Sequence, residues 1–504
     1  MIFRLWFPVL LLTFFTAAGA APAELSPQQR ALHVLNRLGY GPRPGDLDRV
    51  MAMGVDRYIA QQLSPDTIPQ SPAVQQQLAA LQTLALTPQQ LFLDFGPPTL
   101  RAAGTDDAAR KAAQEHSRIP VQQATAARLI RALESPRQLQ EVMAEFWFNH
   151  FNVFEGKGLD HVYVGNYEQN AIRPYALGHF RDLLGATAKH PAMLFYLDNW
   201  QSTAPGFHPP HARKNAPTGL NENYAREVME LHTLGVDGGY TQKDVTELAR
   251  ILTGWTFLPR GNRRIEGGVF VFDARRHDFG DKTFLGRHFH GGGEEEGERA
   301  LDMLAASPAT AHHISYELAQ FFVADNPPPA LVGRLSKTFI DTHGDIREVL
   351  RTLFASAEFW APENDGNKFK TPYQYVVSSL RALGYHVTNF KPAMGAVAQL
   401  GMPIYGCPTP DGYKNTEEAW MNPDAMIHRV NLAVSFVNGG ARFSRAPDED
   451  EQAPPKDKFV PPDPAVLLAT LGNPFSLKTS EAYAAAPPRL RAALLLGSPE
   501  FMRR

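Results

Sequence analysis

Acidic, amide and histidine side chains are concentrated in one stretch, NENYAREVMELHTLGVDGGYTQKDVTELARILTGWTF, residues 221–257. On a helical wheel of about 3.6 residues per turn, Glu227 falls in the core-facing apolar sector. Asn223 extends this polar edge, and His232 flanks the apolar stripe on its other side. A carboxylate that faces a core must be paired, hydrogen-bonded, protonated or bound to a metal. Glu227 is therefore either a general base or metal ligand, or one half of a structural ion pair.

A second polar group lies in EFWFNHFNVF, residues 145–154, where five aromatic residues surround Asn149 and His150. Such a mixture suits a pocket for a ring-shaped or organic ligand, with Trp147 and Asn149 as ligand-binding residues. His150 would act as an acid, a base or a metal ligand. The alternative is a histidine that is hydrogen-bonded within the core.

A third group is formed by His277, Asp278 and Lys282 in RRHDFGDKTFLG. The histidine and aspartate fit either a base with its orienting carboxylate or two metal ligands, and Lys282 fits an anion stabiliser. A turn whose aspartate caps backbone amides is the alternative. Further along, Asp411 and Trp420 in PDGYKNTEEAW either close a pocket or fix a loop onto the core.

The elements that must position these residues are mostly helical. Apolar residues recur at helical spacing along most of the chain, and Ser26, Thr241 and Gly235 are at typical capping positions. The patterns predict helices at 223–234 and 241–252. Alternation with a period of two is clearest in residues 263–286. We therefore expect a mainly α, large multi-helix globular fold with one small β-hairpin element.

Composition and end segments predict an exported protein. Residues 1–20 have a basic start, a short apolar run and a small-residue cleavage site, as in a signal peptide. We expect a main helical domain at 24–444, a linker or flexible loop at 445–464, and a C-terminal helical segment at 465–504 that packs on the main domain. The mature chain, with no further apolar run long enough for a transmembrane helix, would reside in the periplasm or outside the cell.

Several function classes are not supported by the sequence. The net charge of −3 gives no electrostatic reason to expect nucleic-acid binding. HExxH, CxxC and GxSxG motifs are absent from the sequence, and Cys407 is its single cysteine. Zinc-protease, serine-hydrolase and disulfide-based chemistry therefore have no sequence signature here.

Six stretches together resemble a known family. They are HVLNRLGYGPRPGDLDRV, FWFNHFNVF, the stretch 221–257, HDFGDKTFLG, TPYQYVVSSLRALG and GSPEF. In this order, from about His33 to Phe501, they resemble the bacterial family catalogued as domain of unknown function 1800. The resemblance implies a large, mostly helical, exported protein, and a co-encoded exported partner similar to sulfatases. It implies no particular activity.

This chain departs from the family pattern in two places. The family usually has Trp-His-Asn-His-Phe where Phe148 stands in the second position here, which removes one of two histidines. A Gly-Trp-rich family segment appears here as PDGYKNTEEAW.

Two hypotheses follow. The first is an envelope hydrolase-like or ligand-processing enzyme that acts on a small organic or carbohydrate ligand. Its site would join Glu227 and Asn223 to His150 and the loop 277–282, with Glu/His acid–base chemistry or a divalent metal. The second is a non-catalytic exported scaffold or ligand-binding protein that acts with the sulfatase-like partner, and in which the polar clusters hold helices together.

Overall fold

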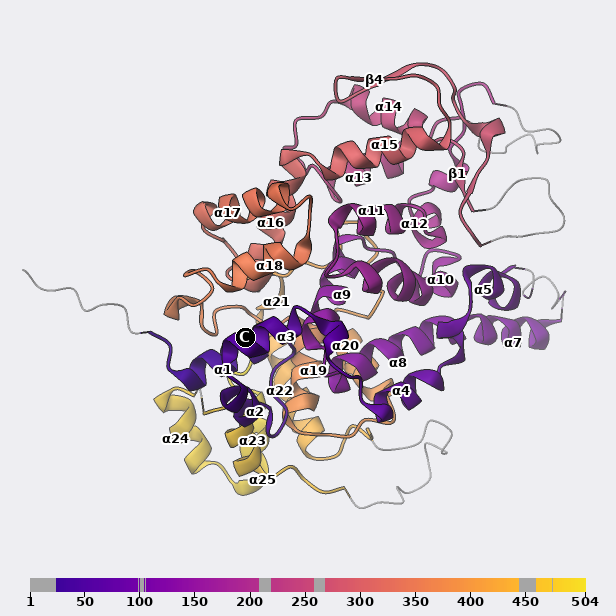
Figure 1. Ribbon diagram of the computed structural model, residues 1–504. Coiled ribbons are helices and arrows are strands. Elements are labelled where there is room, and N and C mark those ends of the chain that lie inside the picture. Colours follow the sequence, from indigo (N-terminus) through magenta and orange to yellow (C-terminus); the bar gives the residue numbers. More distant parts are fainter. Residues whose placement is uncertain are drawn as a thin grey trace, which may run out of the picture.

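A computed structural model describes residues 24–97, 99, 104, 106–207, 219–257, 268–443, 459–473 and 475–504. The expected signal peptide at 1–20 lies outside the described residues, as does most of the expected linker at 445–464. Helices dominate the described part of the chain, which confirms the mainly α fold (Figure 1).

The helices are distributed along the whole described chain. In the first half they are α1 (Pro27–Arg37), α2 (Asp46–Met53), α3 (Val55–Gln62), α4 (Pro72–Ala79), α5 (Pro88–Phe95), α7 (Asp107–Ser117), α8 (Ile119–Glu134), α9 (Gln138–His150), α10 (Asp160–Tyr167), α11 (Phe180–Ala188), α12 (Pro191–Tyr196), α13 (Asn223–Glu230) and α14 (Gln242–Ile251). In the second half they are α15 (Glu294–Ala305), α16 (Pro308–Phe322), α17 (Pro329–Asp341), α18 (Ile346–Phe354), α19 (Pro372–Ala382), α20 (Lys391–Gln399), α21 (Glu417–Trp420), α22 (Pro423–Val437), α23 (Pro464–Thr470), α24 (Leu477–Ala485) and α25 (Pro488–Leu496).

Local capping chemistry explains where many helices begin. The Ser26 hydroxyl accepts from the Gln29 backbone N–H while the Gln29 side chain returns to the Ser26 N–H, and Thr241 and Asp244 form the same reciprocal pair before α14. These capping boxes satisfy backbone donors that have no partner inside the helix. Proline often occupies the first turn, where its missing N–H costs nothing, as at Pro27.

The first helix of the stretch 221–257 is shorter than predicted. α13 ends at Glu230, and the N–H groups of His232 and Leu234 donate to carbonyls five residues back, at 3.1 and 2.8 Å. Gly235 then takes φ +81°, as its predicted capping role requires. This wide final turn places His232 inside the protein, only 1% exposed.

The β structure differs in detail from the single predicted hairpin. Among the described residues it consists of two antiparallel pairs, β1 (Trp255–Thr256) with β2 (Val271–Phe272), and β3 (Lys282–Phe284) with β4 (Arg287–Phe289). The second pair is a tight hairpin whose two-residue turn has positive φ at both Leu285 and Gly286. Turns of this kind match the twist of paired strands. The hairpin therefore lies later in the chain than the range 263–286 predicted.

Helix α9 passes through the middle of the molecule, and most of its residues are buried. In Figure 1, α13, α14, α15 and the strands lie at one end of the molecule, while α1, α2 and the C-terminal helices lie at the other. The chain end is tied to the interior, because the N–H of Arg504 donates to the Lys368 carbonyl at 2.8 Å and its guanidinium donates to the Phe321 carbonyl at 2.9 Å.

Among the described helices, none is both long enough and apolar enough to cross a bilayer.

Candidate functional site

A cleft of about 220 Å³ opens where α9, α16, the turn after α13 and the loop 402–415 meet. His150 comes from the last turn of α9, and His313 and Glu317 come from adjacent turns of α16. Because residues four apart share one face of a helix, His313 and Glu317 both reach the same wall of the cleft.

These three side chains converge. The His150 Nδ1 lies 2.7 Å from a Glu317 carboxylate oxygen, and the His313 Nε2 lies 3.6 Å from the other oxygen of the same carboxylate. One ligand atom from each residue falls within 4.8 Å of the others. The fold brings His150 and Glu317 together although they are 167 residues apart in the sequence.

Both nitrogens of His150 face oxygen acceptors. Its Nε2 lies 3.2 Å from the His232 carbonyl, and its Nδ1 faces Glu317. A ring protonated on both nitrogens would satisfy both acceptors. A histidine that binds a metal through one nitrogen commonly donates its other N–H to a carbonyl, so a divalent ion at Nδ1 would leave the contact with His232 unchanged.

Electrostatics in the cleft favour a charged carboxylate. Burial opposes ionisation of Glu317, but His150 and His313 outweigh it and hold the pKa of this carboxyl below its ordinary value. The neighbouring His232 is fully enclosed, and burial followed by the charges of His150 and His313 lowers its pKa well below the ordinary value. His232 is therefore a neutral ring beside His150 and Glu317, with its ring centroid 6.0 Å from that of His150.

Glycine at position 235 lets His313 approach the turn after α13. A Cβ at Gly235 would lie 3.1 Å from the His313 Nδ1, and its φ of +81° disfavours any other residue. The His313 Nε2 lies 3.2 Å from the Leu231 carbonyl. The stretch 221–257 thus contributes to the site mainly through the turn that follows α13, and not through the polar edge of α13.

The loop 402–415 forms the opposite wall, and Asn149 holds it. The Asn149 amide donates to the Tyr413 carbonyl at 2.8 Å and accepts from the Tyr413 N–H at 2.7 Å. A Cβ at Gly412 would lie 2.3 Å from the Asn149 carbonyl oxygen. Asp411 and Lys414 pair at 2.8 Å at the rim, and the Trp420 indole donates to the Lys414 carbonyl at 2.6 Å. The described contacts of Asn149 and Trp420 therefore position the loop.

Glu227 and Asn223 belong neither to the lining of this cleft nor to the histidine group. Among the described residues, the Glu227 carboxylate has no hydrogen-bond partner and is half-buried. Burial, followed by the charge of Glu230, raises its pKa, and Asp411 contributes in the same direction. Asn223 is exposed at the start of α13. The structure thus brings His150 together with His232, but among the described residues neither histidine contacts the Glu227 carboxylate; His232 reaches Glu227 only through the backbone, where its N–H donates to the Glu227 carbonyl at 3.1 Å.

His277 and Lys282 form a separate, enclosed group with Glu296, and the Asp278 carboxylate is not part of this group. The Lys282 ammonium lies 2.6 Å from Glu296, which also lies 3.4 Å from the His277 Nε2, and the Lys282 and His277 side chains are 0% exposed. Asp278 does not pair with His277 but with Arg250, at 2.7 Å. Lysine already neutralises the carboxylate of this cluster, which is the arrangement of a structural ion pair.

Trp147 is part of the core. It is fully buried, and its indole N–H donates to the Ala176 carbonyl at 2.9 Å. Its edge faces the His150 ring at 5.4 Å between centroids, so it supports the histidine from behind.

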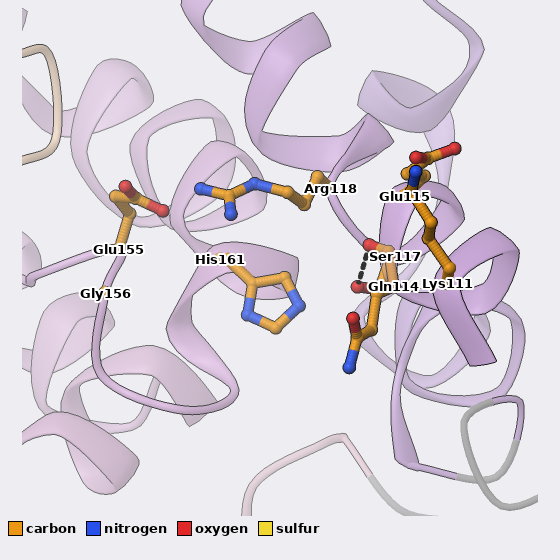
Figure 2. Close-up of a pocket in the computed structure, with 8 residues that line it drawn as sticks. All are labelled: Lys111, Gln114, Glu115, Ser117, Arg118, Glu155, Gly156 and His161. Carbon is orange, nitrogen blue, oxygen red and sulfur yellow. Dashed lines mark hydrogen bonds between the residues drawn. The ribbon is translucent and has the colours of Figure 1, made fainter. Parts of the chain in front are cut away.

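A different cleft, of about 450 Å³, lies between the end of α7 and the loop 155–161 (Figure 2). The His161 ring points into it, with the Nδ1 held by the Gly158 carbonyl at 2.5 Å. Lys111, Arg118 and Glu155 are its charged neighbours. The metal-ligand groups found among the described residues do not include His161. This cleft therefore has room for a ligand but lacks a convergent set of catalytic groups.

The comparison with protein families matches residues 33–503 to the family described as protein of unknown function (DUF1800). The chain belongs to this family. The match covers all the cleft residues from α9 to the loop 402–415. Neither the curated proteins nor the solved structures contain a match to this chain.

Sequence reasoning missed His313 and Glu317. The signal was present, because ISYELAQF and the preceding His-His place a histidine and a glutamate four residues apart on one predicted helix. Two ligands at this spacing on one helix are a frequent half of a metal site. The third member of the group, His150, was a candidate in the sequence, but its contact with Glu317 becomes visible only in the folded structure.

Proposed function

We propose that this protein is an exported, metal-dependent hydrolase whose active site is the cleft between α9 and α16. The observation that carries the proposal is the convergence of His150, His313 and Glu317 on one wall of an open cleft. Two histidines and one carboxylate bind Zn²⁺ in hydrolytic enzymes, and they leave a coordination position for water. A bound divalent ion would supply a hydroxide nucleophile near neutral pH.

The residues of the chain supply three further functions. The His232 carbonyl orients the His150 ring, so that Nδ1 faces the cleft. Asp411 and Lys414, paired at the rim, offer one acceptor and one donor group to a polar substrate. Glu145 lines the inner wall, where burial raises its pKa, and its Oε2 has no hydrogen-bond partner among the described residues. A carboxyl of this kind can donate a proton to a leaving group.

The size of the cleft limits the substrate. A volume of about 220 Å³ is smaller than the roughly 300–1,000 Å³ typical of a drug-sized ligand site. We therefore propose that the cleft accepts one small polar group, such as a sugar ring or an acyl group, of an organic or carbohydrate substrate in the cell envelope.

The test is metal binding by the purified mature protein. After treatment with a chelator, the protein would be titrated with Zn²⁺ and Mn²⁺, and its metal content measured by elemental analysis. Glu317→Gln should weaken binding at the cleft by at least about tenfold. Glu230→Gln is the matched control. Glu230 lines the same cleft but is not part of the group of His150, His313 and Glu317, and its substitution also replaces a carboxylate with an amide of the same shape.

Hydrolysis of p-nitrophenyl esters and glycosides, with and without the metal, is the second measurement. The proposal expects turnover that requires both the metal and Glu317. Equal metal affinity in wild type and Glu317→Gln, in a variant with the native circular dichroism spectrum, would contradict it.

A second candidate function is binding of a protein partner. On α22 the side chains of Ile427, Val430 and Val434 are exposed, and their spacing of three and four residues puts them on one face. Exposed apolar stripes often mark interaction sites. On this alternative, Val434→Lys would abolish co-purification with the co-encoded sulfatase-like protein, whereas Glu317→Gln would not change it.

A further inference from the structure

The hairpin β3–β4 presents a second group of metal-ligating side chains, none of which lines the cleft. Asp281 precedes β3, His288 lies in β4, and His290 directly follows β4. One ligand atom from each of the three residues falls within 4.8 Å of the others. All three side chains are exposed.

The strand register explains why they meet. Thr283 pairs with His288 and Lys282 with Phe289, so Asp281 stands opposite His290 when the pairing is continued by one residue. Alternate residues of a strand point to the same side. Lys282 and Phe289 therefore point into the protein, while Asp281, His288 and His290 share the outer face of the hairpin.

The distances match those of a shared ion better than those of hydrogen bonds. The Asp281 Oδ2 lies 3.6 Å from the His288 Nε2, and the Asp281 Oδ1 lies 3.7 Å from the His290 Nδ1. Tetrahedral Zn²⁺ with bonds of about 2.1 Å separates its ligand atoms by about 3.4 Å. Both separations are longer than a hydrogen bond and close to this spacing. The two imidazole rings lie edge to face, 4.4 Å apart between centroids.

The backbone of the hairpin is held in place by Arg299 of α15 and Asp244 of α14. The Arg299 guanidinium donates to the His288 carbonyl at 2.5 Å and lies 3.9 Å from the Phe289 ring centroid. The Leu285 N–H at the turn donates to Asp244 of α14 at 2.8 Å. Ion binding would therefore require side-chain rotations only, with little cost in backbone ordering.

We infer that Asp281, His288 and His290 form a surface site for a divalent transition metal ion such as Zn²⁺. Imidazole and carboxylate ligands suit Zn²⁺, Ni²⁺ and Cu²⁺, whereas Mg²⁺ and Ca²⁺ prefer oxygen ligands alone. The ion would join the residue before β3 to the end of β4, and its remaining coordination position would face solvent. This inference does not depend on the function proposed for the cleft.

Calorimetric titration with Zn²⁺ tests the site. In the Glu317→Gln background, which removes a cleft ligand, we expect one Zn²⁺ per chain at the hairpin. His288→Ala, His290→Ala and Asp281→Asn should each raise the dissociation constant at least about tenfold. His386→Ala, which removes another exposed histidine outside the group, should leave it unchanged.

Substitution with Co²⁺ gives an independent readout, because the intensity of its visible absorption reports low coordination number and disappears when ligands are lost. Loss of the hairpin signal in His288→Ala/His290→Ala, with the signal kept in Glu317→Gln, supports the site. Unchanged Zn²⁺ stoichiometry and affinity in the double variant would overturn it. If only the cleft proposal fails, the wild-type chain should bind one Zn²⁺. This ion should be lost in the hairpin variants and kept in Glu317→Gln.

Discussion

The cleft group and the enclosed group are built from the same residue types but are placed in opposite surroundings. In the cleft, Glu317 is 30% exposed and its partners are histidines. In the enclosed group, Glu296 is 3% exposed and its nearest partner is the Lys282 ammonium. A permanent cation that is sealed from solvent leaves no position for a metal or a substrate. The difference shows that solvent access and the identity of the cation, more than the presence of histidine and carboxylate, separate a candidate site from a structural ion pair.

Removal of the enclosed cation should have the largest effect. Lys282→Met leaves the Glu296 charge buried without its main partner, and breaking a buried pair in this way costs about 3–5 kcal/mol. Denaturant unfolding measures the loss. Lys243→Met on the exposed surface of α14 is the control, with an expected change within about 0.5 kcal/mol. A loss below about 1 kcal/mol in Lys282→Met would show that the enclosed group is not a structural ion pair.

A smaller loss of stability is expected at the wall of the cleft. Gly412→Ala places a Cβ 2.3 Å from the Asn149 carbonyl oxygen at a position with φ +66°, so the loop 402–415 must shift. Strain of this kind costs about 1–3 kcal/mol. Gly401→Ala is a matched control, because its φ of +89° is also positive but a Cβ there meets no atom within 4 Å. Equal losses of stability in the two variants would show that the positive φ alone causes the effect. The close approach of Gly412 to Asn149 would then not contribute to the stability of the cleft wall.

The pH dependence of stability should have opposite signs for two carboxyl groups, Glu296 in the enclosed group and Glu145 on the cleft wall. Burial disfavours the Glu296 charge, but hydrogen bonds from His277 and Lys282 outweigh it and lower the pKa of Glu296. Its contribution to stability is therefore present above the unfolded pKa and is lost as the pH falls through the folded pKa. Burial raises the pKa of Glu145 on the cleft wall, so that its contribution is present in acid and is lost as the pH rises through the folded pKa.

Unfolding measured from pH 3 to pH 8 checks these signs. Relative to wild type, Glu296→Gln should become less stable as the pH rises, because it lacks the favourable charge. Glu145→Gln should become more stable relative to wild type as the pH rises, because it lacks the buried, unfavourable charge that Glu145 acquires. Parallel pH profiles for the two variants would contradict a raised pKa of Glu145.

Much of the fold could be predicted from the sequence, because caps and periodicity are local. The capping box of Thr241, the cap at Gly235 and the mainly α class were predicted and are confirmed. The end of α13 was misplaced, because the wide turn that buries His232 depends on packing against α9. The hairpin was placed too early, because its turn holds Leu285 at a φ of +46°, which leucine rarely adopts, so the sequence carries no Asn-Gly or Asp-Gly signal at this turn.

The candidate site was less predictable than the fold. His150 was chosen for its aromatic surroundings, yet its partner Glu317 lies 167 residues away, and local patterns contain no information about that contact. The pairing of Lys282 with Glu296 was equally inaccessible, which is why Lys282 was interpreted as an anion stabiliser. Roles that depend on which distant charge lies nearby require the folded structure.

The smallest effect on stability should come from a substitution of Glu317, the carboxylate of the proposed metal site. In Glu317→Gln the amide NH₂ can donate to the His150 Nδ1 at the same 2.7 Å contact, while the His150 Nε2 still donates to the His232 carbonyl. An amide thus replaces a carboxylate that is 30% exposed, so the expected change in the free energy of unfolding is below about 1 kcal/mol. Denaturant unfolding and Zn²⁺ titration on the same preparation measure both quantities. A loss of stability as large as that of Lys282→Met would place Glu317 in the same class as Glu296, as half of a structural ion pair, and the distinction between the cleft and the enclosed group would fail.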